Sequence, residues 1–312
     1  KWSAANSRWQ PADIEEAAAS TTQKAIFGFG GQVSTTNLVS SSGVVGSDQT
    51  GVGTGRRELA ASGYGGDKAI FGYGKAADRT NISNLVSNTG VVATDTTGVG
   101  TARESLAAAG FGGDKAIFGF GTPDGSDYTN ITNLVSNAGV VATDTTGVGT
   151  SRHYPAASSY GGDKALFGFG YSHDDSYNAI YHSTTNLVSN TGVISSDTSG
   201  LGTGRSGLSA ASYGGDKAIF GFGHVDYNET NVSNLVSNTG VVASDQTGVG
   251  TARERLAAAG YGGDKAIFGF GFSGNVENVT NLVSNTGVVA TDTTGVGTGR
   301  IGPAAAGYSS TA

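Results

Sequence analysis

Two histidines and two aspartates lie close together in one stretch of the chain, and such side chains can bind a divalent metal or transfer protons. His173 directly precedes Asp174 and Asp175, and His182 follows nine residues after His173. Imidazole and carboxylate groups suit divalent metals, but this spacing matches no metal-binding motif. The simpler interpretation is a solvated loop. We therefore predict no metal ligand, no cofactor and no catalytic residue here.

Tyrosines are the other chemically useful side chains of the polar stretches that hold these histidines. A tyrosine offers a flat apolar face and a hydroxyl group, which suit protein contacts and stacking against sugar rings. Packing of each loop on its own scaffold is the alternative. The predicted binding residues are Asp124, Asp127, Tyr128, Tyr171, His173, Asp174, Asp175, Tyr177, Tyr181, His182, His224, Asp226 and Tyr227.

Two further motifs recur too often to be catalytic. Gly-x-Gly occurs repeatedly, but a phosphate-binding loop needs a helix after it, and none is predicted. An aspartate and an arginine eight residues apart also recur, as in Asp95 and Arg103. A catalytic group is needed once, whereas a structural contact is needed in every unit. We therefore expect Asp95 to accept hydrogen bonds from the turn that follows it, and Arg103 to tie neighbouring units together.

Six near-identical units, 47 to 53 residues apart, make up nearly the whole chain. Each holds Lys-Ala-Ile-Phe-Gly (Leu for Ile once), then Asn-Leu-Val-Ser, then Gly-Val-Gly-Thr-x-Arg (Leu for Val once). The units end at Arg56, Arg103, Arg152, Arg205, Arg253 and Arg300. A repeat of this length predicts a stacked or ringed architecture.

The differences in unit length are confined to one connection. The distance from the Asn of Asn-Leu-Val to the closing Arg is 19 residues in every unit, whereas the distance from Lys to Asn ranges from 13 to 22. Exposed loops tolerate insertions at little cost, and in repeat proteins insertions map to one face, which is often the binding face. The variable loops are residues 31–36, 75–83, 122–132, 171–185, 224–233 and 272–280.

Each unit contains four segments typical of short strands. In the third unit they are residues 106–110, 115–121, 132–136 and 140–144, with a tight-turn signal at 137–139. These features predict an all-β protein, a six-bladed β-propeller with four antiparallel strands per blade. A β-solenoid is the alternative. In a propeller, the variable loops would share one face with the Gly-Val-Gly-Thr crossings between blades.

The predicted domain organisation is a leader over residues 1–16 followed by the propeller over residues 17–312. We expect the C-terminal strand, 304–308, to close the ring, because an open edge invites aggregation. Residues 17–19 are a competing candidate, and pairing of one unit with a neighbouring chain is the alternative to closure. The leader holds both tryptophans of the chain, Trp2 and Trp9, and we expect it to dock another subunit.

The order of elements resembles a kelch-type blade, as seen from Arg103 to Gly121 and from Asn133 to Asp144. It departs from the kelch pattern because the second strand ends in Gly-Phe-Gly and the blade tryptophan is missing. The phrases Asp-Lys-Ala-Ile-Phe-Gly and Thr-Asn-Leu-Val-Ser-Asn-Thr-Gly-Val-Val also resemble repeats in virion proteins, of tail or fibre type, from tailed phages of marine bacteria. That resemblance implies a virion or extracellular location, with other virion subunits as partners and possible homo-oligomers.

The charge of the chain narrows the class of partner. The net charge is −7, and the variable loops hold eight acidic residues against two basic ones. A surface of this sign repels nucleic acid and favours cationic or neutral polar partners. The chain contains no cysteine, which excludes disulfide and thiol chemistry. No apolar run approaches membrane-spanning length, so we expect no membrane insertion.

A regular framework with all its diversity in one set of loops is typical of a display scaffold. We therefore predict a non-enzymatic structural or recognition protein that binds a cell-surface glycan or a protein. A secreted lectin-like or adhesive propeller is the first alternative, and a glycan-acting enzyme with its site at the channel mouth is the second. Fold alone does not decide among them.

Overall fold

Three-stranded antiparallel sheets form the framework of the chain. The computed structural model describes residues 2–3, 8–9 and 23–309. Six such sheets occur within these residues, one for each sequence unit. In chain order they are β24 (Ala304–Ser309) with β3 (Gln23–Gly28) and β4 (Thr36–Val39); β5 (Ala60–Tyr64), β6 (Lys68–Gly72) and β7 (Ser83–Val86); β8 (Ala107–Phe111), β9 (Lys115–Gly119) and β10 (Thr132–Val135); β11 (Ala156–Tyr160), β12 (Lys164–Gly168) and β15 (Thr185–Val188); β16 (Ser209–Tyr213), β17 (Lys217–Gly221) and β20 (Ser233–Val236); and β21 (Ala257–Tyr261), β22 (Lys265–Gly269) and β23 (Thr280–Val283).

The middle strand of each sheet is buried on both faces. In β9, Ala116, Ile117 and Phe118 have no exposed surface. Their continuous apolar run fits a strand that is covered by a neighbouring sheet on either side. The last residue of the strand, Gly119, is a glycine because a Cβ atom there would lie 2.9 Å from the ring of Phe167 in the next unit. The invariant glycine therefore permits close packing between sheets.

The expected fourth strand is present only as isolated bridges. In the third unit, Val135 pairs with Val141 and Thr132 with Thr145, with no continuous ladder between them. The side chain of Asn133 instead donates a 3.0 Å hydrogen bond to the carbonyl of Ala142. Side-chain hydrogen bonds therefore replace part of the backbone ladder at the outer edge, and each unit has three regular strands and one irregular segment.

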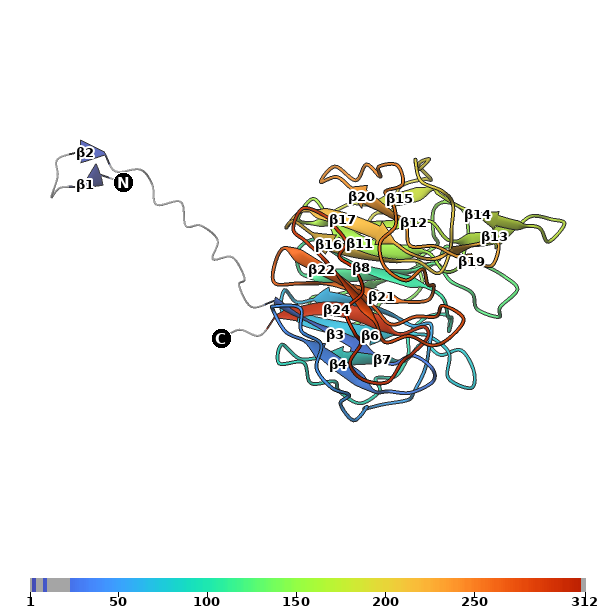
Figure 1. Ribbon diagram of the computed structural model, residues 1–312, viewed down its shortest axis with the longest axis horizontal. Coiled ribbons are helices and arrows are strands. Elements are labelled where there is room, and N and C mark those ends of the chain that lie inside the picture. The colour runs from blue at the N-terminus through green and yellow to red at the C-terminus, as the bar shows by residue number, and fades with distance from the viewer. Residues whose placement is uncertain (1, 4–7, 10–22, 310–312) are drawn as a thin grey trace.

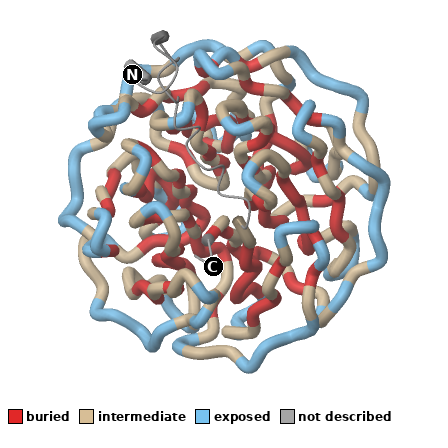
Figure 2. The backbone as a smooth tube through the Cα atoms, turned by 90° about the vertical axis from the view of Figure 1, so that its left-hand side faces the viewer, coloured by how far each residue is buried: buried red, intermediate tan, exposed pale blue. Residues whose placement is uncertain are grey.

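The six sheets lie around a common centre, as seen in the view of Figure 2. Their first strands contact one another in the order β5, β8, β11, β16, β21 and β24, and β24 contacts β5 in turn. The last strand of the chain, β24, pairs with β3 in antiparallel register, with Ala304 opposite Gly28. Segments from the two ends of the described chain thus form one sheet (Figure 1).

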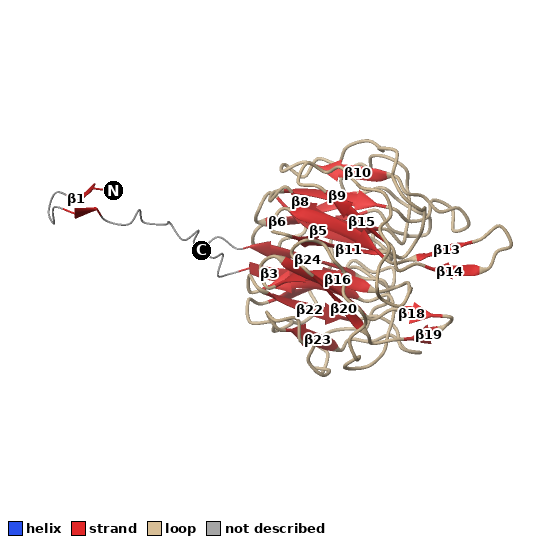
Figure 3. Cartoon of the chain, turned by 90° about the horizontal axis from the view of Figure 1, so that it is seen from above, coloured by secondary structure: helices blue, strands red, loops and turns tan. Residues whose placement is uncertain are grey.

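Two opposite faces result from this arrangement. The turn face holds the Gly-Gly-Asp turns, such as residues 112–114, and the start of β3 and the end of β24 lie on the same side (Figure 1). The loop face holds the variable loops and the crossings between units. Two extra hairpins project from the loop face, β13 (Tyr171–His173) with β14 (Ala179–Tyr181), and β18 (His224–Val225) with β19 (Asn228–Glu229) (Figure 3).

The expected leader, residues 1–16, and the competing strand at 17–19 lie outside the described residues, apart from two short segments. These are β1 (Trp2–Ser3) and β2 (Arg8–Trp9), which pair antiparallel with each other.

The repeated arginine ties neighbouring units together, as expected. Arg103 is fully buried, lies over the ring of Tyr73 in its own unit and donates to Asn133 Oδ1 in the following unit at 2.7 Å. The expectation for Asp95 is wrong. Its carboxylate accepts from the backbone N–H and hydroxyl of Thr54, in the crossing that precedes its unit. The Nδ2 group of Asn84 donates to the same carboxylate at 2.8 Å and so orients it toward that crossing.

Candidate binding site on the loop face

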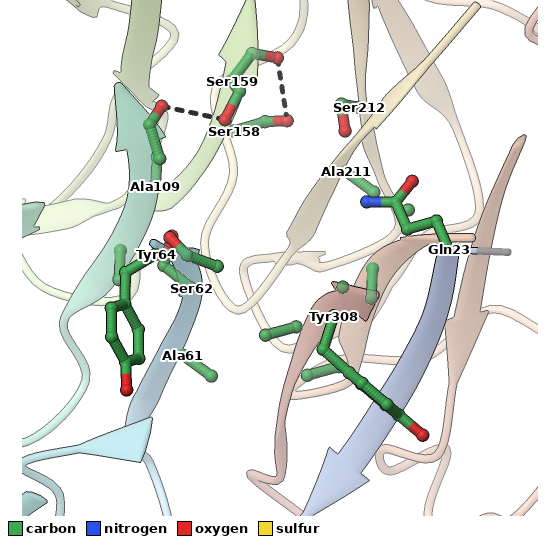
Figure 4. Close-up of a pocket in the computed structure, with 18 of the residues that line it drawn as sticks. Gln23, Ala61, Ser62, Tyr64, Ala109, Ser158, Ser159, Ala211, Ser212 and Tyr308 are labelled. Atoms are coloured by element: carbon green, nitrogen blue, oxygen red, sulfur yellow. Dashed lines mark hydrogen bonds between the residues drawn. The ribbon is translucent and has the colours of Figure 1, made fainter. Parts of the chain in front are cut away.

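A cavity opens at the turn face, but its lining offers little specific chemistry. It has a volume of about 670 Å³ and is lined mainly by alanine, glycine and serine from the first strands of the sheets (Figure 4). Ser159 Oγ donates to the carbonyl of Gly110 at 2.8 Å, so this hydroxyl is used within the wall. The charged lining residues belong to the Asp-Lys pairs of the turns, such as Asp264 and Lys265, which are 2.6 Å apart.

The loop face instead gathers tyrosines and histidines from several loops into one connected group. Neighbouring rings in this aromatic cluster have centroids 4.5 to 6.1 Å apart, within the usual range for aromatic pairs. Its members are Tyr128, His153, Tyr154, Tyr171, His173, Tyr177, Tyr181 and His224. Tyr227 interacts electrostatically with two of them, Tyr171 and Tyr181.

The cluster forms because the crossing that enters a unit pairs with the variable loop of that same unit. His153 bridges to Tyr171, and Ser206 bridges to His224. The fourth variable loop is long enough to fold back as the β13–β14 hairpin, in which Tyr171 lies opposite Tyr181. Fixed crossings thus hold one side of the cluster, and the inserted hairpins supply the other.

His173 is held at the centre of the cluster by two tyrosine hydroxyls. Its Nδ1 lies 2.5 Å from the Tyr128 hydroxyl, and its Nε2 contacts the Tyr171 hydroxyl. A neutral imidazole donates at one nitrogen and accepts at the other. Burial raises the pKa of Tyr128 to about 12, an effect that Tyr171 reinforces. The Tyr128 hydroxyl therefore stays protonated at neutral pH.

His153 lies beneath this layer and stays neutral. Burial lowers its pKa to about 3, and electrostatic interactions with His173, Arg255 and His224 act in the same direction. The rings of Tyr128 and Tyr171 pack against it, with centroids 4.5 and 4.8 Å away. An imidazole that resists protonation behaves as an aromatic packing group, so His153 serves as the floor of the cluster.

Ser206, His224 and Glu254 adopt the order of a serine-hydrolase triad. Ser206 Oγ lies 3.2 Å from His224 Nε2, and His224 Nδ1 contacts Glu254 Oε2. In such a triad the serine attacks a substrate carbonyl. Only 1% of the surface of Ser206 is exposed, so a substrate carbonyl has no path to its hydroxyl. The arrangement fixes the His224 ring at the edge of the cluster instead.

A closed cycle of backbone hydrogen bonds joins the six units and passes through Tyr154 of the cluster. The second residue after each framework arginine donates its N–H to the carbonyl of the equivalent residue in the preceding unit, with N···O distances of 2.7 to 3.3 Å. The cycle comprises Glu58, Ser105, Tyr154, Gly207, Arg255 and Gly302. Arg255 also lies over the Tyr154 ring and pairs with Glu58. The cycle gives the loop face a rigid base.

The sequence-predicted residues are only partly brought together. Tyr128, Tyr171, His173, Tyr177, Tyr181 and His224 join the cluster. Asp124 and Asp174 accept backbone hydrogen bonds within their own loops, from Ser126 and Asp127 in one and from Ser176 and Asn178 in the other. Asp127, Asp175, Asp226 and Tyr227 are exposed at the rim.

His182 does not belong to the cluster. It contacts Ser172 Oγ through Nε2 at 2.7 Å. Its pKa is lowered, first by burial and then by the charge of Arg152.

Sequence reasoning missed His153, Tyr154, Glu254 and Arg255. These residues lie in the crossings, which have the same length in every unit and therefore show no insertion. The available signal was a change of residue type: the pair of residues after the framework arginine is different in every unit. The pairs are Arg57-Glu58, Glu104-Ser105, His153-Tyr154, Ser206-Gly207, Glu254-Arg255 and Ile301-Gly302.

Comparison with known proteins gives no family for the chain, since neither a protein-family model nor a curated protein matches it. Within residues 2–3, 8–9 and 23–309, no three or more histidine, aspartate or glutamate side chains are grouped so that they could hold a metal ion. In the same part of the chain, no helix has the length and apolar character needed to cross a membrane.

Proposed function

We propose that the chain is a six-bladed, kelch-like β-propeller that acts as a non-enzymatic recognition protein and binds a glycan at its loop face. The cyclic order of contacts between first strands and the cycle of backbone hydrogen bonds support the propeller. The pairing of β24 with β3 supports closure of the ring by the C-terminal strand.

The aromatic cluster is the observation that carries the binding role. Apart from Tyr154, which lies in a crossing, its tyrosines and the neighbouring Tyr227 come from three successive variable loops. Two of these loop tyrosines are almost fully accessible: Tyr177 is 81% exposed and Tyr227 is 95% exposed. Exposed tyrosine rings supported by a rigid base suit stacking against sugar rings, with hydroxyls left for polar contacts. The cluster occurs once within the described residues, so we expect one site per chain rather than the six of a lectin with a site in every blade.

The proposed setting is a virion or another extracellular particle, by resemblance of the repeat phrases to phage virion repeats. The start of β3 and the end of β24 lie on the turn face, opposite the β13–β14 hairpin (Figure 1). A chain attached through its ends would present the loop face outward. Partners of the turn face would then be other subunits, and the partner of the loop face would be a surface glycan.

Glycan-array binding of the intact chain tests this function, followed by calorimetry on the best ligand. We expect binding with one site per chain and its loss in the double variant Tyr177→Ala/Tyr227→Ala, whose exposed side chains contribute little to folding. Lys115→Ala, on the turn face, is the control and should bind normally. Unchanged binding by the double variant would contradict the site, six sites per chain would favour the lectin, and turnover of the glycan would favour an enzyme.

A further inference from the structure

We infer that the ligand of the aromatic cluster is a glycan with free, positively charged amino groups, that is, a polymer of amino sugars. This inference rests on the proposed function and adds the chemical class of the ligand. Three observations support it: two tyrosines are exposed, carboxylates belong to the same loops, and the nearby arginines already contact other side chains.

The two most exposed tyrosines have backbone conformations that disfavour tyrosine. Tyr177 has φ of 60° and Tyr227 has φ of 62°, both in the left-handed region. Asp226, just before Tyr227, has φ of 47°, so this two-residue hairpin tip has the backbone for which Asn-Gly is preferred. Tyrosine is strained in this conformation, because its Cβ atom crowds the neighbouring backbone. Such strain, at a ring that packs on little, indicates a role in contact with a ligand.

The three variable loops that hold Tyr128, Tyr177 and Tyr227 also hold six carboxylates. They are Asp124, Asp127, Asp174, Asp175, Asp226 and Glu229. The Asn178 side chain and backbone lower the pKa of Asp174, which keeps this group charged. Asp226 interacts electrostatically with Tyr181 of the neighbouring hairpin, and its backbone hydrogen-bonds to that tyrosine. Negative charge is therefore fixed beside the aromatic surface.

The arginines nearest to the cluster already have partners. Arg255 lies over Tyr154 and pairs with Glu58, and Arg79 donates to Glu104 at 2.5 Å. Arg255 is held by these contacts, whereas Arg79 also lowers the pKa of Asp124 and so compensates that one carboxylate of the rim. The site thus retains an unbalanced negative charge that a ligand can complement.

An ammonium group satisfies both features of the site. A cation over a tyrosine face gains about 0.5 to 2 kcal/mol, according to its exposure, and adjacent carboxylates add to that attraction. A neutral sugar would gain the stacking alone, and an anionic sugar would be repelled. A protonated amino sugar offers a ring that stacks and a charge that pairs, so it complements the whole surface.

A matched pair of ligands separates charge from ring stacking. Binding of the full chain to a glucosamine oligomer and to an N-acetylglucosamine oligomer of equal length would be measured by calorimetry. The second ligand has the same ring but no charge. We expect the glucosamine oligomer to bind at least about fivefold more tightly at low salt. This preference should shrink at high salt and at a pH above the pKa of the sugar amine.

Variants locate the effect. Asp226→Asn and Asp175→Asn should weaken the glucosamine oligomer and leave the acetylated oligomer unchanged. Asp163→Asn makes the same change of net charge on the turn face and should alter neither ligand. Equal binding of the two oligomers by the wild-type chain would overturn the inference and leave glycan recognition standing. Failure of every glycan on an array would instead remove the proposed function.

An oligolysine peptide supplies the same ammonium chemistry from another source. We expect it to bind more weakly than the glucosamine oligomer, because it has no ring to stack. Equal or tighter binding of the peptide, with loss in Tyr227→Ala, would overturn the assignment to a sugar.

Discussion

The guanidinium carbon of Arg103, the last residue of its sequence unit, lies 4.2 Å from the centroid of the Tyr73 ring in the same unit. The same arginine donates to the Phe120 carbonyl and to Asn133 in the unit that follows. Equivalent arginines lie over a phenylalanine ring at 4.3 to 4.5 Å in the other units. One side chain thus joins two sheets through stacking and hydrogen bonds, and it is repeated because every boundary needs it.

Replacement of Arg103 by alanine should destabilise the fold strongly. The side chain is fully buried, and removing it leaves the Asn133 amide oxygen and the Phe120 carbonyl without this donor. We expect the free energy of unfolding in urea to fall by about 3–5 kcal/mol. Lys115→Ala, an exposed control, should change it by less than about 0.5 kcal/mol. An unchanged unfolding midpoint for Arg103→Ala would contradict the role of the arginine as a tie.

The six aspartates that hold the crossings should make the fold sensitive to acid. Burial raises the pKa of Asp95, but hydrogen bonds from Thr54 and Asn84 and the charge of Arg56 outweigh burial and hold this pKa below its usual value of 3.8. The equivalents Asp48, Asp144, Asp197, Asp245 and Asp292 have lowered pKa values for similar reasons.

Below pH 3.8 the unfolded chain binds protons at these aspartates that the folded chain does not yet bind. The contribution of these aspartates to stability should therefore be fully present above that pH and should fall as the pH drops through the lower, folded-state pKa values. Urea unfolding between pH 6 and pH 2.5 measures this loss. Asp95→Asn should show a shallower fall than the wild type, and parallel curves would count against the assignment.

The repeat pattern predicts the framework well, because it is written six times in the sequence. The apolar run Ala-Ile-Phe shows which strand is buried, and the constant distance from Asn133 to Arg152 shows which elements pack in fixed register. The irregular fourth segment could not be predicted, because Val140-Val-Ala has strand-like residues whose ladder is lost to the Asn133 side chain.

The site was predictable only where loop length varied. The hairpin tyrosines Tyr171 and Tyr181 stand out as insertions. His153 lies in a segment of constant length, and nothing in the sequence shows that the crossing bridges to Tyr171. Contacts between residues of different units depend on how the sheets are arranged, which no single repeat encodes.

His153→Phe should flatten part of the pH dependence of stability. The pKa of His153 is lowered from 6.5 to about 3, chiefly by burial. Between pH 6.5 and about pH 3, His153 binds a proton in the unfolded chain but not in the folded chain. The wild type therefore loses stability as the pH falls below 6.5. Phenylalanine keeps the ring and carries no titrating group. We expect the variant to lose less stability between pH 7 and pH 4.5 in urea unfolding. A steeper loss in the variant would argue against a neutral, buried imidazole.

Ser206 should not react as a nucleophile in spite of its contact with His224. Its hydroxyl is shielded, and activated serines must reach their substrate. Treatment with a fluorophosphonate, followed by mass spectrometry of the intact protein, should show no covalent adduct. An adduct that is present in the wild type and absent in Ser206→Ala would establish an accessible, activated serine and would favour the enzymatic alternative.

Tyr227→Gly should separate stability from binding. Tyr227 is 95% exposed, and its backbone has φ of 62°, a conformation that glycine adopts without steric cost. The variant should therefore be as stable as the wild type, or more stable by up to about 1 kcal/mol. It should nevertheless bind the glucosamine oligomer more weakly, since the exposed ring is lost. Thermal unfolding and calorimetry on the same sample measure the two effects. Tyr227→Phe keeps the ring and should retain most of the binding. A variant that lost stability and kept its affinity would show that the tyrosine supports the hairpin and does not contact the ligand.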